Sequence, residues 1–250
     1  MKIHLQSDIH LEFDSKPDNL VMADVYVLAG DIGVISNTRA IKDYFNSIKD
    51  NCDHIIWVLG NHEFYHSVYE ESLEKALSIA NECGIKLLDI AFGTQDLEID
   101  GVKFWGTTFW TDLHEHDWFA HKKIQDGLND FHVIHKKNGR KFTAHESYEI
   151  NQFSRKLINW DADVIITHHC PTMIPHPKFP LNELAYAFNN TGLEQKIIDS
   201  NIKYWLYGHT HHSTVEEYNC TLVVSNQYGY GVYNEQTGYN PNLILEINNE

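Results

Sequence analysis

Side chains suited to metal binding follow strand-like segments at five places along this chain. Each place comes after a run rich in Ile, Val, Leu or Trp, as expected of a buried strand. The five segments are Asp8-Ile9-His10, Gly30-Asp31, Gly60-Asn61-His62-Glu63, His168-His169 and Gly208-His209-Thr210-His211. Three of them begin with a glycine, which permits a tight turn out of the strand. Five such segments within one chain indicate a single built site.

The first half of the chain alternates between strand-like and helical patterns. Strands are expected at 2–7, 24–29 and 54–59, with helices near 38–49 and over 69–83. Alternation of this kind predicts parallel strands joined by crossover helices, whose carboxyl ends meet at one edge of a sheet. That geometry would bring Asp8, Asp31 and Asn61 together.

The second half is more varied. Residues 97–100 and 102–108 flank an Asp100-Gly101 turn, which indicates a β-hairpin. Further elements are expected as helices at 143–160 and 191–201, strands at 163–167 and 204–207, and an antiparallel meander of 214–218, 221–225 and 243–247. The pattern is weakest between 111 and 142, where we expect a cap or insertion over the strand ends.

Three of the expected helices begin with a capping-box pattern, in which Ser or Thr is followed three residues later by Glu. Ser67 and Glu70 form the pattern at the start of the helix at 69–83, and Thr143 and Glu146 open the helix at 143–160. The third pattern opens the helix at 191–201. Taken together, the strand and helix patterns alone predict a mixed α/β fold.

Composition narrows the class of protein. The 250 residues, 42% of them hydrophobic, can bury a substantial core, and we expect one domain over 1–250. A formal net charge of -16 argues against a general nucleic-acid or membrane-surface binder, because either would need a basic face. It does not exclude a phosphorylated substrate, since bound divalent metals would supply positive charge locally.

The compartment and the membrane status are also open to prediction. No segment approaches 18 consecutive apolar residues, and no basic stretch followed by a long apolar run opens the chain. The four cysteines show no C-x-x-C spacing: Cys52, Cys83, Cys170 and Cys220. We therefore expect reduced thiols in a cytoplasmic protein with no membrane partner.

The five segments, in this order, resemble the blocks of the calcineurin-like metallophosphoesterase superfamily: D-x-H, G-D, G-N-H-[DE], H and G-H-x-H. The resemblance covers nearly the whole chain. It implies a four-layer α/β/β/α sandwich with two mixed β-sheets. It also implies a binuclear metal-dependent phosphoesterase that hydrolyses a phosphate ester by attack of a metal-bridging hydroxide.

The family's ligand positions fall on seven residues of this chain: Asp8, His10 and His211 for one ion, Asn61, His168 and His209 for the other, and Asp31 shared between them. The chemistry of these residues agrees independently, because imidazole, carboxylate and amide donors without thiolate suit two divalent ions such as Mn, Fe or Zn. The resemblance gives His62 a catalytic role, as the group that assists the leaving oxygen.

The sequence leaves two alternatives open at each of two places in the motifs. Only one of His168 and His169 can point at the metals on an extended segment, and the family pattern favours His168. Glu63 could orient His62 or stabilise the following turn, and we favour a structural role.

The substrate is less well defined. Arginine is scarce and absent from the metal motifs, so no arginine fork is available to hold a phosphomonoester. This slightly favours a phosphodiesterase or an enzyme for a small phosphorylated metabolite; the alternative is a phosphomonoesterase acting on a protein or a small molecule. A nuclease is disfavoured by the acidic charge, and a non-catalytic scaffold by the complete ligand set.

One basic cluster stands against the acidic background: Lys122, Lys123, Lys136, Lys137, Arg140 and Lys141. It could help to position an anionic substrate over the metals, or it could form a solvated charged surface. The sequence leaves the oligomeric state open.

Overall fold

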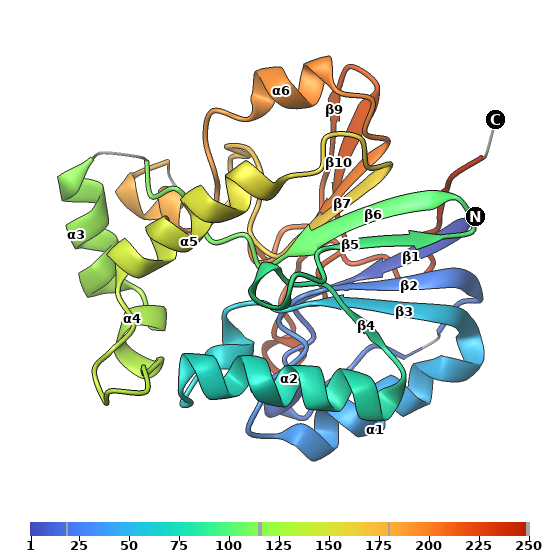
Figure 1. The fold of residues 1–250 in the computed structure, drawn as a ribbon, viewed down its shortest axis with the longest axis horizontal. Helices are drawn as coiled ribbons and strands as arrows, with labels where there is room; N and C mark the ends of the chain where they lie inside the picture. Colours follow the sequence, from blue (N-terminus) through green and yellow to red (C-terminus); the bar gives the residue numbers. More distant parts are fainter. Residues whose placement is uncertain (19, 115–116, 180, 249–250) are drawn as a thin grey trace.

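The computed structural model describes residues 1–18, 20–114, 117–179 and 181–248, and their strands form two sheets (Figure 1). The first sheet has the order β11-β1-β2-β3-β4, and the second has the order β5-β6-β7-β8-β10-β9. The strands of the first sheet are β1 (Lys2–Gln6), β2 (Ala23–Ala29), β3 (Cys52–Val58), β4 (Lys86–Leu87) and β11 (Leu245–Glu246). Those of the second are β5 (Asp96–Ile99), β6 (Val102–Thr107), β7 (Val164–Thr167), β8 (Tyr204–Tyr207), β9 (Val215–Tyr218) and β10 (Thr221–Ser225).

Helices of two kinds connect these strands. The α-helices are α1 (Thr38–Ile48), α2 (Tyr69–Cys83), α3 (Trp118–Gly127), α4 (Asp130–Val133), α5 (Ala144–Leu157) and α6 (Glu194–Asp199). The short 3-10 helices are η1 (Leu11–Phe13), η2 (Lys49–Asn51), η3 (His62–Phe64), η4 (Ile90–Phe92), η5 (Glu183–Ala187) and η6 (Gly231–Tyr233).

Both sheets are mixed, as expected. β1, β2 and β3 run parallel, with Ile3 opposite Val25 and Val25 opposite His54. β6, β7, β8 and β10 are also parallel, while β5, β9 and β11 pair antiparallel to their neighbours. The hairpin predicted around Asp100-Gly101 is confirmed by the pairing of β5 with β6.

The layers follow from the alternation of side chains along each strand. Val25 and Val27 of β2 pack in a core between the two sheets, together with residues of β6, β7 and β8. Tyr26 and Leu28 of the same strand face the other way, into a core shared with α1 and α2. A third core covers the far side of the second sheet and includes Ile197 of α6. The α/β/β/α arrangement is thus confirmed.

Three sequence predictions need correction. α2 begins after Val68 with no side-chain cap, so Ser67 and Glu70 form no capping box. α6 is shorter than 191–201 and also lacks a side-chain cap. The segment at 243–247 does not join a meander, because β11 pairs with β1 in the first sheet. The capping box of Thr143 and Glu146 at the start of α5 is confirmed.

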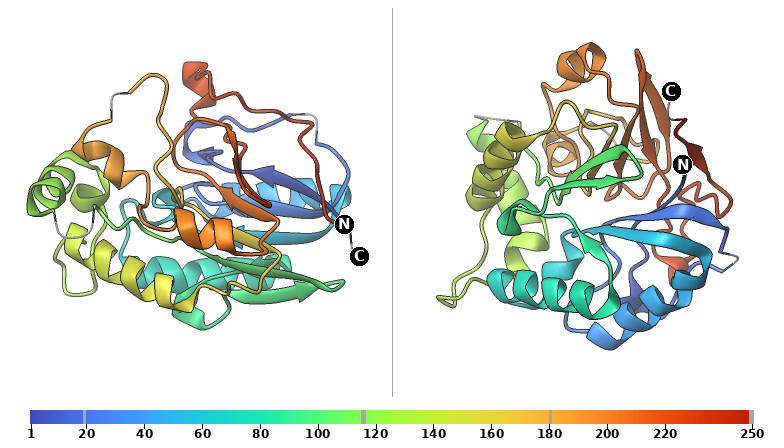
Figure 2. Two further views of the ribbon diagram at one scale, coloured as in Figure 1. Left: turned by 90° about the horizontal axis from the view of Figure 1, so that it is seen from above. Right: turned by 45° about the vertical axis from the view of Figure 1, so that its right-hand side comes forward.

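The weakly patterned region contains two helices. α3 and α4 lie at the end of the molecule toward which β1, β2 and β3 run, opposite the N-terminus (Figures 1 and 2). A cap or insertion at 111–142 remains a prediction, and its position near the strand ends is compatible with that role; residues 115–116 lie outside the described part. Among the described residues, no helix is both long enough and apolar enough to cross a membrane.

Candidate metal centre

The strand ends converge at one place between the two sheets. Asp8 follows β1, Asp31 follows β2 and Asn61 follows β3, all at the carboxyl edge of the first sheet. His168 follows β7, and His209 follows β8 in the second sheet. Parallel strands end at a common edge, so each sheet delivers its polar side chains to the same region.

The backbone at these residues is unusual. Five of them have a left-handed conformation with φ between 50° and 73°: Asp8, His10, Asp31, His209 and His211. Such conformations cost on the order of 1–3 kcal/mol each for residues with a Cβ, and they cluster at functional sites. The surrounding fold holds the backbone in the shape that points these side chains inward.

Glycine is needed where strands pass the centre closely. A Cβ on Gly60 would lie 2.1 Å from Asp31 Oδ1 and 2.5 Å from the Asp31 nitrogen. A Cβ on Gly30 would lie 2.4 Å from His168 Nδ1. The motif glycines therefore give the side chains of the centre room to lie directly against the backbone.

Two groups of side chains meet at Asp31. In the first, His10 Nε2 lies 3.0 Å from His211 Nε2, and His211 Nε2 lies 3.6 Å from Asp8 Oδ1. Asp31 Oδ2 is 3.8 Å from His10 Nε2. Oδ2 of Asp31 therefore lies beside the first group.

The second group lies on the other side of Asp31. Asp31 Oδ1 is 3.4 Å from His168 Nε2, which is 3.0 Å from Asn61 Oδ1. Ligand atoms of Asp31, His168 and His209 all lie within 4.8 Å of one another. The structure thus brings together all seven residues expected to bind metal, with Asp31 between the two groups.

The hydrogen bonds of the histidines fit a metal site. Nδ1 of His10 contacts Glu12 at 3.2 Å, Nδ1 of His211 contacts Glu235 at 2.7 Å, and Nδ1 of His168 contacts the Ala29 carbonyl at 2.9 Å. When Nδ1 donates to an oxygen, the lone pair of Nε2 is left free toward the centre. A set of imidazole, carboxylate and amide donors suits Mn, Fe or Zn.

His209 supports the same interpretation. Its Nε2 is buried and has no hydrogen-bond partner among the described residues. Burial and the neighbouring rings of His169 and His168 hold the pKa of His209 well below its usual value, which keeps this imidazole neutral. A buried, neutral, unpartnered nitrogen is costly unless it has a ligand to bind.

The two adjacent histidines after β7 have different surroundings. His168 faces Asp31 and Asn61, whereas Nδ1 of His169 contacts the Thr108 carbonyl at 3.2 Å. Burial and the neighbouring His168 lower the pKa of His169 to about 3. The geometry therefore selects His168 over His169 for the group around Asp31.

His62 lies at the edge of the first group. Its Nδ1 is 2.8 Å from Glu12 Oε1, its Nε2 is 4.0 Å from Asp31 Oδ2, and its ring stacks on Tyr65 with centroids 4.0 Å apart. Burial disfavours the charged ring, but Asp31 and Glu12 outweigh it and raise the pKa of His62 to about 9. His62 is also close enough to His10 and Asp31 to share an ion with them.

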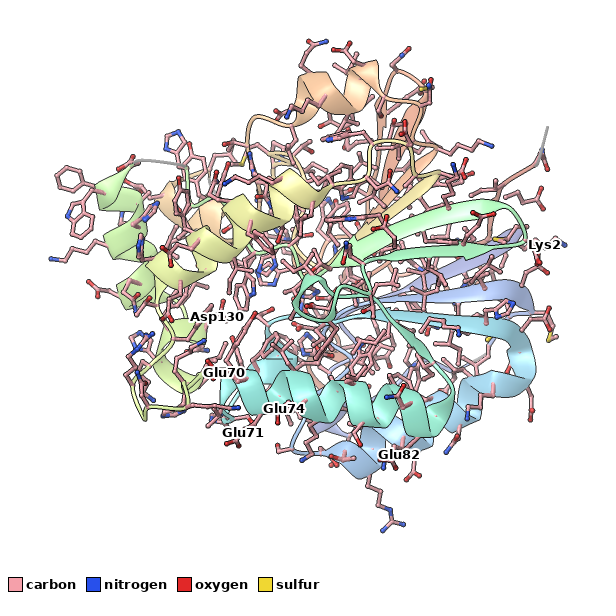
Figure 3. The ribbon with its side chains drawn as sticks, viewed as in Figure 1. Lys2, Glu70, Glu71, Glu74, Glu82 and Asp130 are labelled. Carbon is pink, nitrogen blue, oxygen red and sulfur yellow. The ribbon has the colours of Figure 1, made fainter. Side chains whose placement is uncertain are left out.

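Several supporting residues were not identified from the sequence. Glu12 contacts both His10 and His62, and its only sequence signal is its place two residues after His10. Asp130 of α4 (Figure 3) accepts hydrogen bonds from the Asn61 amide at 2.9 Å and the Tyr65 hydroxyl at 2.6 Å. No sequence pattern pointed to Asp130, because it comes from the weakly patterned region.

Glu63 has a structural role, but its contacts are with the loops before it rather than with the turn that follows it. It is fully buried and accepts hydrogen bonds from the backbone nitrogens of Asp31 at 3.0 Å, Ile32 at 2.7 Å and Gly60 at 2.6 Å. These contacts join the loops after β2 and β3, which carry Asp31 and Asn61. The carboxylate that contacts the His62 ring at 2.8 Å is that of Glu12.

A cavity of about 670 Å³ opens over the centre. Its described lining includes Asp31, Asn61, His62, His209 and His211, and it contains no lysine or arginine. An anionic group bound in this cavity would therefore find no positively charged side chain of Lys or Arg in the described lining.

Three residues of the basic cluster form ion pairs with glutamates of α2 and α5. Lys136 pairs with Glu70 at 2.6 Å and Lys137 with Glu74 at 3.1 Å, both on α2 (Figure 3). Arg140 pairs with Glu146 at 2.6 Å. These contacts favour a paired surface over a substrate-positioning role for these three residues.

Comparison with known proteins gives a consistent result. Residues 1–213 match the family model described as calcineurin-like phosphoesterase. An uncharacterized protein of Acanthamoeba polyphaga mimivirus is 28% identical over 276 residues, covering 96% of this chain and 95% of the viral protein. The crystal structure of a phosphopantetheinyl hydrolase from Mycobacterium tuberculosis superposes with a TM-score of 0.67 at 16% identity, covering 92% of this chain and 89% of the hydrolase. At that identity, the likeness concerns the fold alone.

Proposed function

Because this chain belongs to the calcineurin-like phosphoesterase family and is a metal-dependent phosphoric ester hydrolase, we propose that it works with two divalent ions on a small phosphorylated substrate. One ion would be held by Asp8, His10 and His211, and the other by Asn61, His168 and His209. Asp31 would contact both. Phosphodiesters are slightly favoured over monoesters, and manganese is the ion to test first.

One observation carries the proposal of two ions. The two carboxylate oxygens of Asp31 face different groups, with Oδ2 3.8 Å from His10 Nε2 and Oδ1 3.4 Å from His168 Nε2. A carboxylate between two sets of inward-facing donors is suited to bridge two cations. When bound, the ions supply a water-derived nucleophile at neutral pH and neutralise charge on the phosphoryl oxygens.

The protein's own residues hold this arrangement and move a proton. Glu12 fixes Nδ1 of His62, which leaves Nε2 as the nitrogen that can give a proton to the leaving oxygen. The raised pKa of His62 favours the protonated ring at neutral pH. Bound cations would oppose that shift, because they offset the charge of Asp31. Tyr65 stacks on the ring and restricts its orientation.

The cavity supports the choice of substrate class. Its size falls in the range of small-molecule sites, at about 670 Å³. Because its described lining contains no Arg or Lys, a doubly charged phosphomonoester would depend on the ions and on the protonated His62 ring, whereas a singly charged diester needs less compensation. The formal charge of -16 disfavours a nuclease.

The experiment that tests this function is reconstitution. Metal-stripped protein should be inactive on an aryl phosphodiester and on the matching monoester, and Mn²⁺ should restore hydrolysis, with the diester favoured. A higher rate on the monoester would reverse the order of the two substrate classes. No activity on either substrate, together with no retained metal, would overturn the proposal.

Two variants test the residue roles in the same assay. His62→Ala should retain both ions and lose about 10²–10⁴-fold in turnover, the typical cost of a lost acid–base group. Asp31→Asn should lower the content of both ions. If His62→Ala emptied a site and Asp31→Asn did not, the assignment of His62 as a non-ligand would be wrong.

The cellular compartment is a further part of the proposal. All four cysteines are free, which supports a reducing compartment such as the cytoplasm.

A further inference from the structure

A second cavity, of about 300 Å³, adjoins the cavity over the metal centre. The two cavities share Phe179, Phe188 and Thr210 in their walls. The ring of Phe188 stacks on that of His209, with centroids 4.8 Å apart and planes 24° apart. The second cavity therefore begins one aromatic ring away from a proposed metal ligand.

The lining of this second cavity is largely apolar. We call it the apolar pocket; its apolar walls are Ile174, Phe179, Leu181, Leu184, Ala185 and Phe188. Its described lining contains no Asp, Glu, Lys or Arg. A charged group on a ligand would therefore meet none of these side chains, and burial lowers the pKa of His176, the histidine in that lining.

Four polar side chains stand in the described lining of the apolar pocket, and each makes a hydrogen bond within the protein. Thr210 Oγ1 accepts from the Gln227 side-chain amide at 2.8 Å, and His176 Nδ1 accepts from the Lys178 nitrogen at 3.0 Å. Asn182 Oδ1 accepts a hydrogen bond from the Leu184 nitrogen at 2.9 Å. Asn189 accepts from the Ile174 nitrogen at 3.3 Å and donates to the Ala185 carbonyl at 2.9 Å. These amides brace the walls and leave few free polar groups for a ligand, so the surface offered to a ligand is mainly hydrocarbon.

Two apolar residues of the apolar pocket are unusually exposed. Phe179 is 67% exposed and Leu181 is 59% exposed. Covering such surface with an apolar group is favourable, because it removes that surface from water. The shared walls place this surface within reach of a molecule bound in the metal cavity.

We propose that the apolar pocket binds an uncharged apolar arm of the phosphoester, such as an alkyl chain, while the phosphoryl group lies over the metal centre. This inference rests on the proposed function, since it requires a phosphoester in the adjoining cavity. It defines the substrate class further, as a phosphoester that carries a hydrocarbon arm beside its phosphoryl group.

The binding test uses phosphonates, which the enzyme cannot hydrolyse. Affinities of methylphosphonate and octylphosphonate for the Mn²⁺-loaded protein would be measured by titration calorimetry. Octylphosphonate should bind more tightly, by about fourfold for each methylene that enters the apolar pocket. Equal affinities for the two phosphonates would overturn the proposal.

Variants connect the preference to this cavity. Leu181→Asp places a charge in the wall, and Ala185→Phe fills the space; both should reduce the octyl-to-methyl affinity ratio at least about fivefold, a little more than one methylene's contribution. Phe153→Asp is the matched control, because Phe153 is 53% exposed on α5 and lies outside the apolar pocket. A ratio unchanged in both pocket variants, or reduced equally in the control, would overturn the assignment.

Turnover separates this inference from the proposed function. p-Nitrophenyl phosphodiesters with methyl and octyl arms should show the same preference in kcat/KM. Hydrolysis of both at equal kcat/KM would contradict the apolar pocket and leave the phosphoesterase function intact. Absence of turnover with a preserved preference for octylphosphonate would contradict the function and leave the pocket assignment standing.

Discussion

Glu12 connects the two kinds of histidine in the centre. One of its oxygens lies 3.2 Å from Nδ1 of the proposed ligand His10 and 2.8 Å from Nδ1 of the proposed acid His62. Glu235 has a narrower role, because its carboxylate contacts Nδ1 of His211 at 2.7 Å and no other histidine ring among the described contacts. Glu12 contacts both a proposed ligand and the proposed acid, whereas Glu235 contacts a proposed ligand only. Variants of the two carboxylates can therefore separate an effect on metal binding from an effect on proton transfer.

Glu12→Gln should lower both metal affinity and turnover. Loss of a residue that orients a ligand typically costs 10–100-fold in affinity or activity. At saturating Mn²⁺ the effect on binding disappears, but kcat should stay about 10-fold low because His62 is no longer held by a carboxylate. Steady-state kinetics over a range of Mn²⁺ concentrations measures both effects.

Glu235→Gln serves as the control for this prediction. It should weaken metal binding through His211 and recover nearly full kcat once Mn²⁺ is saturating. If Glu12→Gln recovered kcat to the same extent, Glu12 would act through His10 alone and the role assigned to it at His62 would be wrong.

The site was predictable from the sequence only as far as its motifs reached. The seven expected ligands and His62 all lie at the centre, because each follows a strand and strand ends meet at a sheet edge. Asp130 and Glu235 were not predictable in this way. Asp130 contacts Asn61 and Glu235 contacts His211, and each comes from a segment outside the metal motifs. Tertiary packing, which the motifs do not encode, brings these segments to the centre.

At the scale of secondary structure elements, two similar sequence patterns have different outcomes. Thr143 Oγ1 accepts a hydrogen bond from the Glu146 nitrogen at 3.2 Å, and the Glu146 carboxylate accepts from the Thr143 nitrogen at 3.1 Å. At the start of α2, the neighbouring loop makes the contacts instead. The Tyr69 nitrogen donates to the His135 carbonyl at 2.7 Å, and the His135 nitrogen donates to the Ser67 carbonyl at 2.9 Å.

Thr143→Ala should therefore lower the free energy of unfolding by about 1 kcal/mol, the usual cost of a lost N-terminal cap. Ser67→Ala should cost less than half as much, because the Ser67 side chain caps no helix. Urea unfolding of the two variants and the parent protein gives both values. Equal losses would show that the side chain of Ser67 contributes at α2 after all.

The other differences at this scale also have tertiary causes. Thr191, expected to start a helix, has its hydroxyl bound to Asp112 at 2.7 Å, so α6 begins three residues later. β11, near the end of the sequence, pairs with β1, near its start, with Ile3 opposite Leu245. Local patterns cannot predict such partners, because hydrophobic alternation marks a strand without naming its neighbour.

Asp89 makes the stability of the turn after β4 depend on pH. This carboxyl caps η4 through the Ala91 nitrogen at 2.7 Å, and burial raises its pKa to about 6. The folded state therefore holds the proton more tightly than the unfolded state, whose pKa is about 3.9. The stability from this group is fully present below pH 4 and is lost as the pH rises through 6.

Asp89→Asn keeps an acceptor for Ala91 and removes the titration. The free energy of unfolding of the variant minus that of the parent protein should rise by on the order of 1–3 kcal/mol between pH 4 and pH 7 and then level off. Urea unfolding at several pH values would measure it. A difference that stayed constant with pH would show that Asp89 remains ionised in the folded protein.

At the scale of the whole molecule, the chain is acidic and also buries carboxylates at the proposed metal centre. The formal net charge is -16, and two of the carboxylates counted in it, Asp8 and Asp31, are buried next to a cavity whose described lining has no Lys or Arg. Burying such carboxylates is costly unless positive charge accompanies them. The proposed ions would therefore belong to the folded state as well as to the reaction.

Metal removal should consequently lower the melting temperature. An ion at about 1,000 times its Kd stabilises the folded state by about 4 kcal/mol, which corresponds to roughly 8–16 °C for a chain of this size. Calorimetry would compare the Mn²⁺-loaded protein with the chelated protein, and Asp31→Asn should respond much less to Mn²⁺. A melting temperature unaffected by chelation would mean that Asp8, Asp31 and the facing histidines are stable without cations, and the case for a resident pair of ions would fail.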